Sequence, residues 1–255
     1  GDRAAANACS THVLGKSPGG VRAEEETGYM VRRFLVLIIG AVVAMASASG
    51  TEAVLPYTID IAASAQNYTI IGGEAGDSVG RRLATGDFNG DSIDDILMGV
   101  PRGDGPANAR LDAGEAYVVF GSASLTGTKD LASSVPNVTV YGADAGDFLG
   151  LSVAAADVNG NGIDDIILGA PNADGVANAK LDSGETYVIF GSASLSGTKD
   201  VALGQQSVTV YGQEPGDTLG REVAAGDVTG TSVADLLIGA PLADGPDDAG
   251  NPACV

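Results

Sequence analysis

Three short loops carry oxygen-bearing side chains at positions 1, 3, 5 and 9. In the first loop, side chains at positions 1, 3, 5 and 9 and a backbone carbonyl at position 7 come from Asp87, Asn89, Asp91, Asp95 and Ile93. A tight turn with this spacing can point alternate oxygens at one centre. Ca²⁺ accepts six to eight oxygen ligands in flexible geometry, whereas Mg²⁺ requires a stricter octahedron and keeps its water. The first loop therefore predicts a calcium site, with Mg²⁺ as the weaker candidate.

The same spacing recurs in two further loops. The second contains Asp157, Asn159, Asn161, the carbonyl of Ile163, and Asp165. The third contains Asp227, Thr229, Thr231, the carbonyl of Val233, and Asp235. The carboxylates number three, two and two, and Thr is a poorer calcium ligand than Asn or Asp. We expect the affinity to fall from the first loop to the third, with the third the first candidate to remain empty.

Other interpretations of these loops are weaker. Asp, Asn and Gly also build ion-free turns, but the fixed repetition favours a cation. An EF-hand needs an acidic residue at position 12 and flanking helices, whereas position 12 is here Met98, Leu168 or Ile238, each in an apolar run. No His or Cys lies near the loops, which argues against zinc and copper. Asp94 and Asp164 are either supporting residues behind the ligands or simply exposed.

The loops belong to a unit that repeats every 70 residues. A Gly-Asp-x-x-Gly turn precedes each loop, and an apolar run ending in Gly-x-Pro follows it. The turns cover 76–80, 146–150 and 216–220. Continuous apolar runs are typical of strands covered on both faces. The second unit predicts four strands, at 149–156, 165–170, 185–190 and 207–212.

Four-stranded units of this kind predict an all-β fold, a β-propeller of four-stranded blades. The complete units are 71–140 and 141–210, the unit 211–255 is incomplete, and 67–71 ends a preceding one. About two and a half blades fall short of the four to eight that a propeller needs. We interpret residues 67–255 as part of a larger propeller, with further blades in the full-length product. Assembly with other chains is the alternative.

The order of turn, acidic loop and Gly-Ala-Pro resembles the FG-GAP repeat, known from the propeller of integrin α chains and from bacterial secreted proteins. The second unit carries it as Leu149-Gly150, the loop 157–165 and Gly169-Ala170-Pro171. The first unit departs mildly, with Val100 in place of the Ala. The resemblance implies a propeller with calcium on one rim and a ligand or partner bound elsewhere.

The N-terminal region is typical of a targeting segment. Arg32 and Arg33 precede an apolar run, 34–45, and Ala46-Ser47-Ala48 fits a cleavage site. A run of about 12 residues is shorter than the roughly 20 that a membrane helix needs. We therefore predict an upstream segment 1–29 with a misassigned start, a signal peptide 30–48 and a linker 49–66. An uncleaved signal anchor is the alternative, and no membrane span is expected in the mature chain.

Composition limits the function classes. The net charge of −20 argues against a nucleic-acid partner, because phosphates would be repelled. The single histidine, His12, lies before the predicted cleavage site, and no nucleophile–base pair or Gly-x-Ser-x-Gly motif appears. Catalytic residues are therefore not expected. The acidic residues Asp104, Asp112 and Glu115 read as a solvated loop, with a binding surface as the weaker alternative.

The functional prediction is a secreted or cell-surface, calcium-binding protein for adhesion or ligand binding, with the periplasm as another location. Its partner would be a protein or a polysaccharide bound at the propeller loops. The alternative is an accessory propeller of an extracellular hydrolase or lyase, because some lyases and phospholipases carry FG-GAP-like propellers. A purely structural surface protein rigidified by calcium is the third hypothesis.

Overall fold

The computed structural model describes residues 35–38 and 68–243. The predicted upstream segment 1–29, the linker 49–66 and most of the predicted signal peptide 30–48 lie outside these residues. The chain divides into the units Gly1–Val31 and Arg32–Val255, and every described residue belongs to the second. In the described part, helix is confined to the 3₁₀ turns Pro106–Asn108, Val176–Asn178 and Val201–Leu203. None of the helices in this part is long and apolar enough to cross a membrane.

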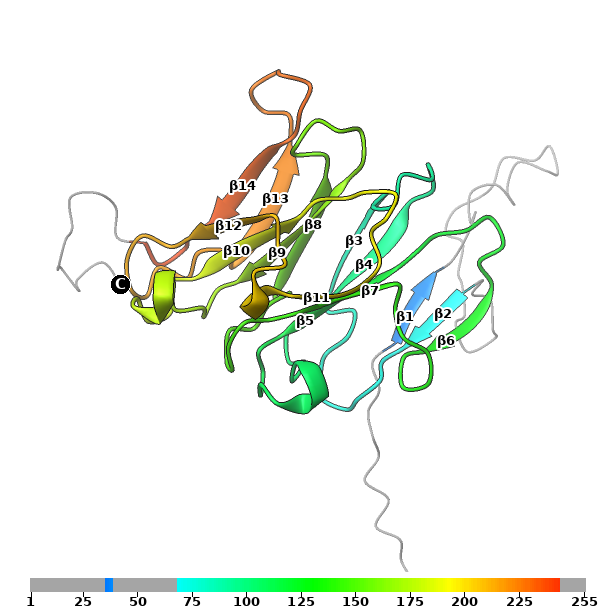
Figure 1. The fold of residues 1–255 in the computed structure, drawn as a ribbon, viewed down its shortest axis with the longest axis horizontal. Helices are drawn as coiled ribbons and strands as arrows, with labels where there is room; N and C mark the ends of the chain where they lie inside the picture. The colour runs from blue at the N-terminus through cyan, green and yellow to red at the C-terminus, as the bar shows by residue number, and fades with distance from the viewer. Residues whose placement is uncertain (1–34, 39–67, 244–255) are drawn as a thin grey trace, which may run out of the picture. The chain divides into compact units, whose positions relative to one another are not determined.

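The predicted four-stranded units are confirmed as two successive blades (Figure 1). The first blade pairs adjacent antiparallel strands, β3 (Arg82–Gly86), β4 (Asp95–Val100), β5 (Glu115–Val119) and β7 (Val138–Tyr141). The second repeats this order with β8 (Ser152–Ala156), β9 (Asp165–Ala170), β10 (Glu185–Ile189) and β12 (Val208–Tyr211). A third unit contributes the antiparallel pair β13 (Glu222–Gly226) and β14 (Asp235–Gly239). The fold is all-β, with the blades of a β-propeller.

A short additional strand joins each blade to the one before it. Strand β11 (Gly197–Asp200), from the second unit, pairs in parallel with β7 of the first blade. Strand β6 (Gly127–Asp130) does the same with β2 (Tyr68–Ile71). On its other side β2 pairs with β1 (Leu35–Ile38), which lies within the predicted signal peptide. The first two repeats therefore each supply one strand to the outer edge of the preceding sheet.

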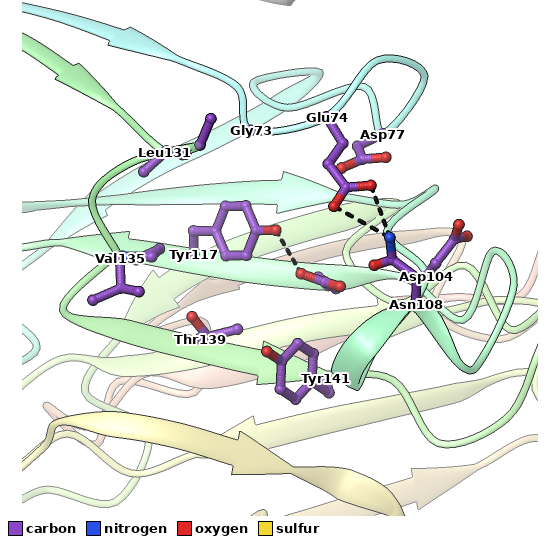
Figure 2. Close-up of a pocket in the computed structure, with 13 residues that line it drawn as sticks. Gly73, Glu74, Asp77, Asp104, Asn108, Tyr117, Leu131, Val135, Thr139 and Tyr141 are labelled. Carbon is purple, nitrogen blue, oxygen red and sulfur yellow. Dashed lines mark hydrogen bonds between the residues drawn. The ribbon is translucent and has the colours of Figure 1, made fainter.

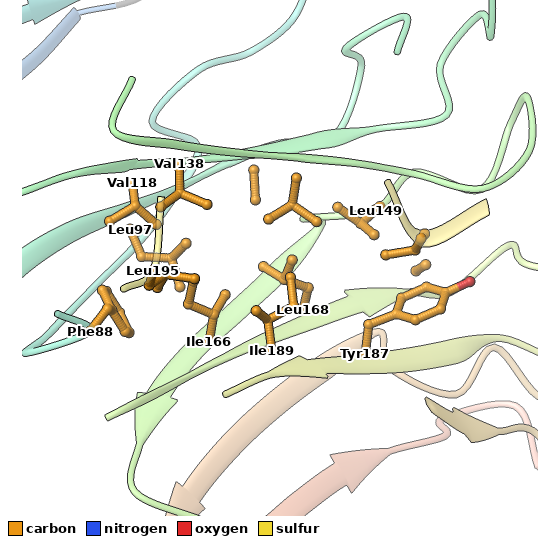
Figure 3. Close-up of a cluster of buried hydrophobic side chains, with 14 of the residues drawn as sticks. Phe88, Leu97, Val118, Val138, Leu149, Ile166, Leu168, Tyr187, Ile189 and Leu195 are labelled. Carbon is orange, nitrogen blue, oxygen red and sulfur yellow. The ribbon is translucent and has the colours of Figure 1, made fainter. Parts of the chain in front are cut away.

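The main hydrophobic core lies between the two complete blades (Figure 3). Phe88, Leu97 and Val118 of the first blade are fully buried, as are Ile166 and Leu168 of the second. Burying a large apolar side chain stabilises the fold by about 1.5–3 kcal/mol. Phe88 directly follows the first candidate ligand, so this packing also anchors the start of the first loop.

Candidate functional site

The first loop is a tight turn organised by the carboxylate of Asp87. Its Oδ1 accepts from the amides of Gly90 and Asp91, at 2.7 and 3.1 Å, and its Oδ2 accepts from the amide of Ser92 at 2.7 Å. Gly90 and Ser92 have positive φ angles of 76° and 67°. Such a conformation costs a non-glycine residue roughly 1–2 kcal/mol. The carboxylate therefore stabilises a turn that Ser92 does not favour by itself.

Asp95 closes the first loop from the beginning of β4. It is fully buried, and its carboxylate accepts from the amides of Phe88 and Gly121 at 3.0 and 2.8 Å. Burial raises the pKa of Asp95, the two amide hydrogen bonds oppose that rise, and the charges of Asp91 and Asp87 add to it. A cation at this loop would offset the repulsion among the three carboxylates.

The second loop repeats this geometry. The carboxylate of Asp157 accepts from the amides of Gly160, Asn161 and Gly162 at 2.7, 3.1 and 2.7 Å. Burial alone would raise the pKa of Asp157, but the hydrogen bonds from these amides outweigh it and lower the pKa. At the other end, Asp165 is fully buried and accepts from the side-chain amide of Asn159 at 2.8 Å. The first and ninth ligand positions thus lie at the two ends of one turn.

The third loop repeats the backbone hydrogen bonds to its first aspartate but is less buried. Asp227 accepts from the amide of Gly230 at 2.6 Å, and Asp235 accepts from the hydroxyl of Thr229 at 3.1 Å. The residue after the first ligand position is the fully buried Phe88 in the first loop, but it is Val228 here, with 70% of its surface exposed. The third loop therefore lacks the hydrophobic anchor of the first.

All three loops present oxygen donors only, and this donor set suits a hard cation such as Ca²⁺. Among the described residues, no three His, Cys, Asp or Glu side chains converge closely enough to form a metal cluster. The second and third loops have only two candidate carboxylates each, and in the first loop Asp87 turns its oxygens toward backbone amides. The donor chemistry fits calcium, and the ligand assignments in all three loops remain predictions.

A separate acidic pocket lies beside the first blade (Figure 2). Its volume is about 360 Å³, and its lining includes Glu74, Asp77, Asp104 and Glu115. Glu115 is only 6% exposed, and it accepts from the hydroxyl of Tyr117 at 2.5 Å and the amide of Gly105 at 2.9 Å. The expectation of a solvated loop is therefore wrong for Glu115, because the first residue of β5 lies beneath that loop.

The second blade has an equivalent pocket of about 270 Å³ that contains Asp144, Asp147 and Glu185. The amide of Asp144 donates to Asp147 at 3.0 Å, so this aspartate caps its own turn. Burial raises the pKa of Asp147 to about 7. Burial, together with the charges of Glu74, Asp104 and Asp112, raises the pKa of Asp77 to about 6.

Comparison with known proteins identifies the repeat and its relatives. The FG-GAP repeat model matches residues 79–119 and 149–189. Integrin alpha pat-2 of Caenorhabditis elegans is 32% identical over 171 residues, which is 66% of this chain and 13% of that protein. Integrin alpha-PS2 of Drosophila melanogaster is 29% identical over 179 residues, 68% of this chain and 11% of that protein. Phosphatidylinositol-glycan-specific phospholipase D of Bos taurus is 31% identical over 169 residues, 66% of this chain and 19% of that protein. The chain therefore spans less than a fifth of the length of each of these relatives.

Proposed function

Since this chain is an FG-GAP repeat protein related to integrin alpha chains, we propose that it is a calcium-binding adhesion or ligand-binding module at the cell surface or outside the cell. The observation that carries the proposal is the shared geometry of the acidic loops. In each loop the first aspartate organises the turn, and the ninth position begins a blade strand. An ion held there would brace the blade edge, while other loops carry specificity.

The calcium proposal is tested by titrating the full chain with calcium chloride in a calorimeter and following its thermal unfolding. We expect binding at about two sites and a higher melting temperature, because a ligand that binds only the folded state stabilises it by mass action. The double variant Asp87→Ala, Asp157→Ala removes the first ligand of both loops and should abolish the heat and the shift. Asp94→Ala removes an exposed carboxylate outside the ligand set and serves as the control. A folded wild-type protein that gives neither heat nor shift would show that the loops are only turns.

Secretion is proposed from the basic and apolar residues of segment 30–48. The expected mature protein begins at Ser49, after Ala48. N-terminal sequencing of the protein recovered from the medium or the cell surface checks this. A product that retains residues 30–48 would favour the signal anchor instead.

An accessory role beside an enzyme is the second candidate, and the relationship to phosphatidylinositol-glycan-specific phospholipase D favours it. The chain matches only 19% of the length of that relative, and its own residues include no nucleophile–base pair predicted from the sequence.

A solid-phase binding assay with immobilised proteins and polysaccharides, with and without chelator, tests whether the chain is a binding module. A hydrolysis or lyase assay on the same polysaccharides addresses the enzyme. Turnover by this chain alone would overturn the non-catalytic assignment.

A further inference from the structure

The first and second acidic loops are hydrogen-bonded directly to each other, although 70 residues separate their equivalent positions. The amide of Asp87 donates to Oδ2 of Asp164 at 3.0 Å. In return, the amide of Asp164 donates to the carbonyl of Asp87 at 3.0 Å. Asp87 is the first ligand position of one loop, and Asp164 lies between the last two ligand positions of the next. One residue in each loop is therefore fixed relative to the other.

Two glycines of the first blade leave space for this contact. A Cβ atom added to Gly86 would lie 2.8 Å from Oδ2 of Asp164, closer than real Cβ contacts allow. A Cβ atom on Gly90 would similarly lie 2.9 Å from Cδ1 of Ile163. The two glycines thus give the second loop room to lie against the first.

The junction between the second and third loops keeps only part of this contact. The amide of Ala234 donates to the carbonyl of Asp157 at 3.0 Å, which matches the bond from Asp164 to Asp87. The residue equivalent to Asp164 is Ala234, which has no carboxylate, and the residue equivalent to Gly86 is Ala156. The aspartate that accepts the bond and the glycine that makes room for it therefore occur together at the first junction. At the second junction alanine stands at both positions.

We propose that Asp164 is a positioning residue for the first cation loop and that it couples ion binding in the first two loops. The inference rests on the proposed calcium binding. An ion in the second loop would engage Ile163 and Asp165, on either side of Asp164, and so restrain it. The bond from the Asp87 amide to the Asp164 carboxylate carries that restraint to the first loop, so a first ion meets part of the ordering cost of a second. The coupling must be reciprocal, because it is a difference in binding free energy.

The test is a cycle of calcium titrations by calorimetry on the full chain, using wild type, Asp157→Ala, Asp164→Ala and the double variant. Asp157→Ala should remove the second site and weaken the first by about fivefold or more, the lower end of usual coupling. In the Asp164→Ala background, the same Asp157→Ala change should leave the affinity of the first site unaltered. Asp164→Asn keeps an acceptor oxygen and should retain the coupling. Asp94→Ala, at the equivalent but exposed position of the first repeat, is the control.

Gly86→Ala gives an independent measurement, because it displaces the Asp164 carboxylate without removing any charge. It should abolish the coupling as Asp164→Ala does, and it carries the test if Asp164→Ala does not fold. The proposal would be overturned if the coupling persisted in Gly86→Ala, or if Asp157→Ala left the calcium affinity of the first site unchanged. Either result would leave both cation sites in place. A folded wild-type protein that takes up no calcium would overturn the sites and the coupling together.

Discussion

Asp147 shows how burial in the acidic pockets changes the chemistry of a single carboxyl group. The residue is 5% exposed, and burial raises its pKa to about 7, with the charges of Asp144, Glu185 and Asp174 adding to the rise. In the unfolded chain an aspartate titrates at about 3.9. Between these two values the folded protein holds a proton that the unfolded chain has released. The free energy of unfolding must therefore decrease as the pH rises through this window.

Asp147→Asn is expected to raise the melting temperature at pH 8, where the buried charge costs most. Its effect should be smaller at pH 5, because only the lower part of this pH window has then been crossed. The amide oxygen of Asn can still accept from the amide of Asp144, so the turn is retained. Melting curves from pH 4.5 to 8.5 give the comparison, with Asp94→Asn as a charge-matched exposed control. An equal effect of Asp147→Asn at both pH values would contradict a raised pKa.

The candidate ligands follow from sequence, but their surroundings do not. Alternating oxygens at positions 87 to 95 are local, so the turn made by the Asp87 carboxylate could be anticipated from spacing. The bond from Asp87 to Asp164 and the burial of Glu115 depend on residues brought together only by the fold. A single sequence carries no signal that distinguishes Asp164 from the exposed Asp94.

At the scale of elements, the glycines of the first two Gly-x-Pro motifs allow the next blade to approach. A Cβ atom on Gly99 would lie 2.1 Å from the carbonyl oxygen of Gly150, in the Gly-Asp-x-x-Gly turn of the following repeat. The same relation holds between Gly169 and Gly220, at 1.9 Å. The two motifs that define the repeat are therefore in contact, one from each of two neighbouring blades.

Gly99→Ala is expected to destabilise the protein by about 1–3 kcal/mol, the usual cost of overpacking, because the obstacle is backbone. Gly239→Ala is the matched control in the third repeat. The nearest atom to its added Cβ is the carbonyl oxygen of Glu222 at 3.5 Å, an ordinary contact. Urea unfolding of both variants measures the difference. Equal losses would mean that strand propensity, and not blade packing, sets the cost.

Strand positions were largely predictable, and the exception has a physical reason. The predicted runs 165–170, 185–190 and 207–212 correspond to β9, β10 and β12. In β9, which is buried along its whole length, the continuous apolar residues indicate a covered sheet. No hydrophobic pattern indicates β11, because its residues Gly-Thr-Lys-Asp are polar and pair at the edge of a sheet. An edge strand of this kind is formed by the neighbouring sheet and not by its own hydrophobicity.

At the scale of the whole molecule, the repeats share a sequence pattern but differ in how deeply their strands are buried. Leu97 of the first blade is fully buried, whereas the equivalent Leu237 in β14 is 42% exposed. Leu97 lies in a blade that packs against the next, and in the described residues β14 pairs with β13 alone. The exposed fraction of the leucine at this repeat position therefore differs according to how far neighbouring blades cover each strand.

Leu97→Ala should lower the free energy of unfolding by about 2–5 kcal/mol, the range for large-to-small changes in a core. Leu237→Ala should lower it by less than about 1 kcal/mol, because much of the side chain already meets water. Denaturant unfolding at several protein concentrations makes the comparison. If the two losses were equal and independent of concentration, residues of the same chain would have to cover β14. If the loss at Leu237 grew with concentration, a second copy would supply the cover, and the propeller would be completed between chains.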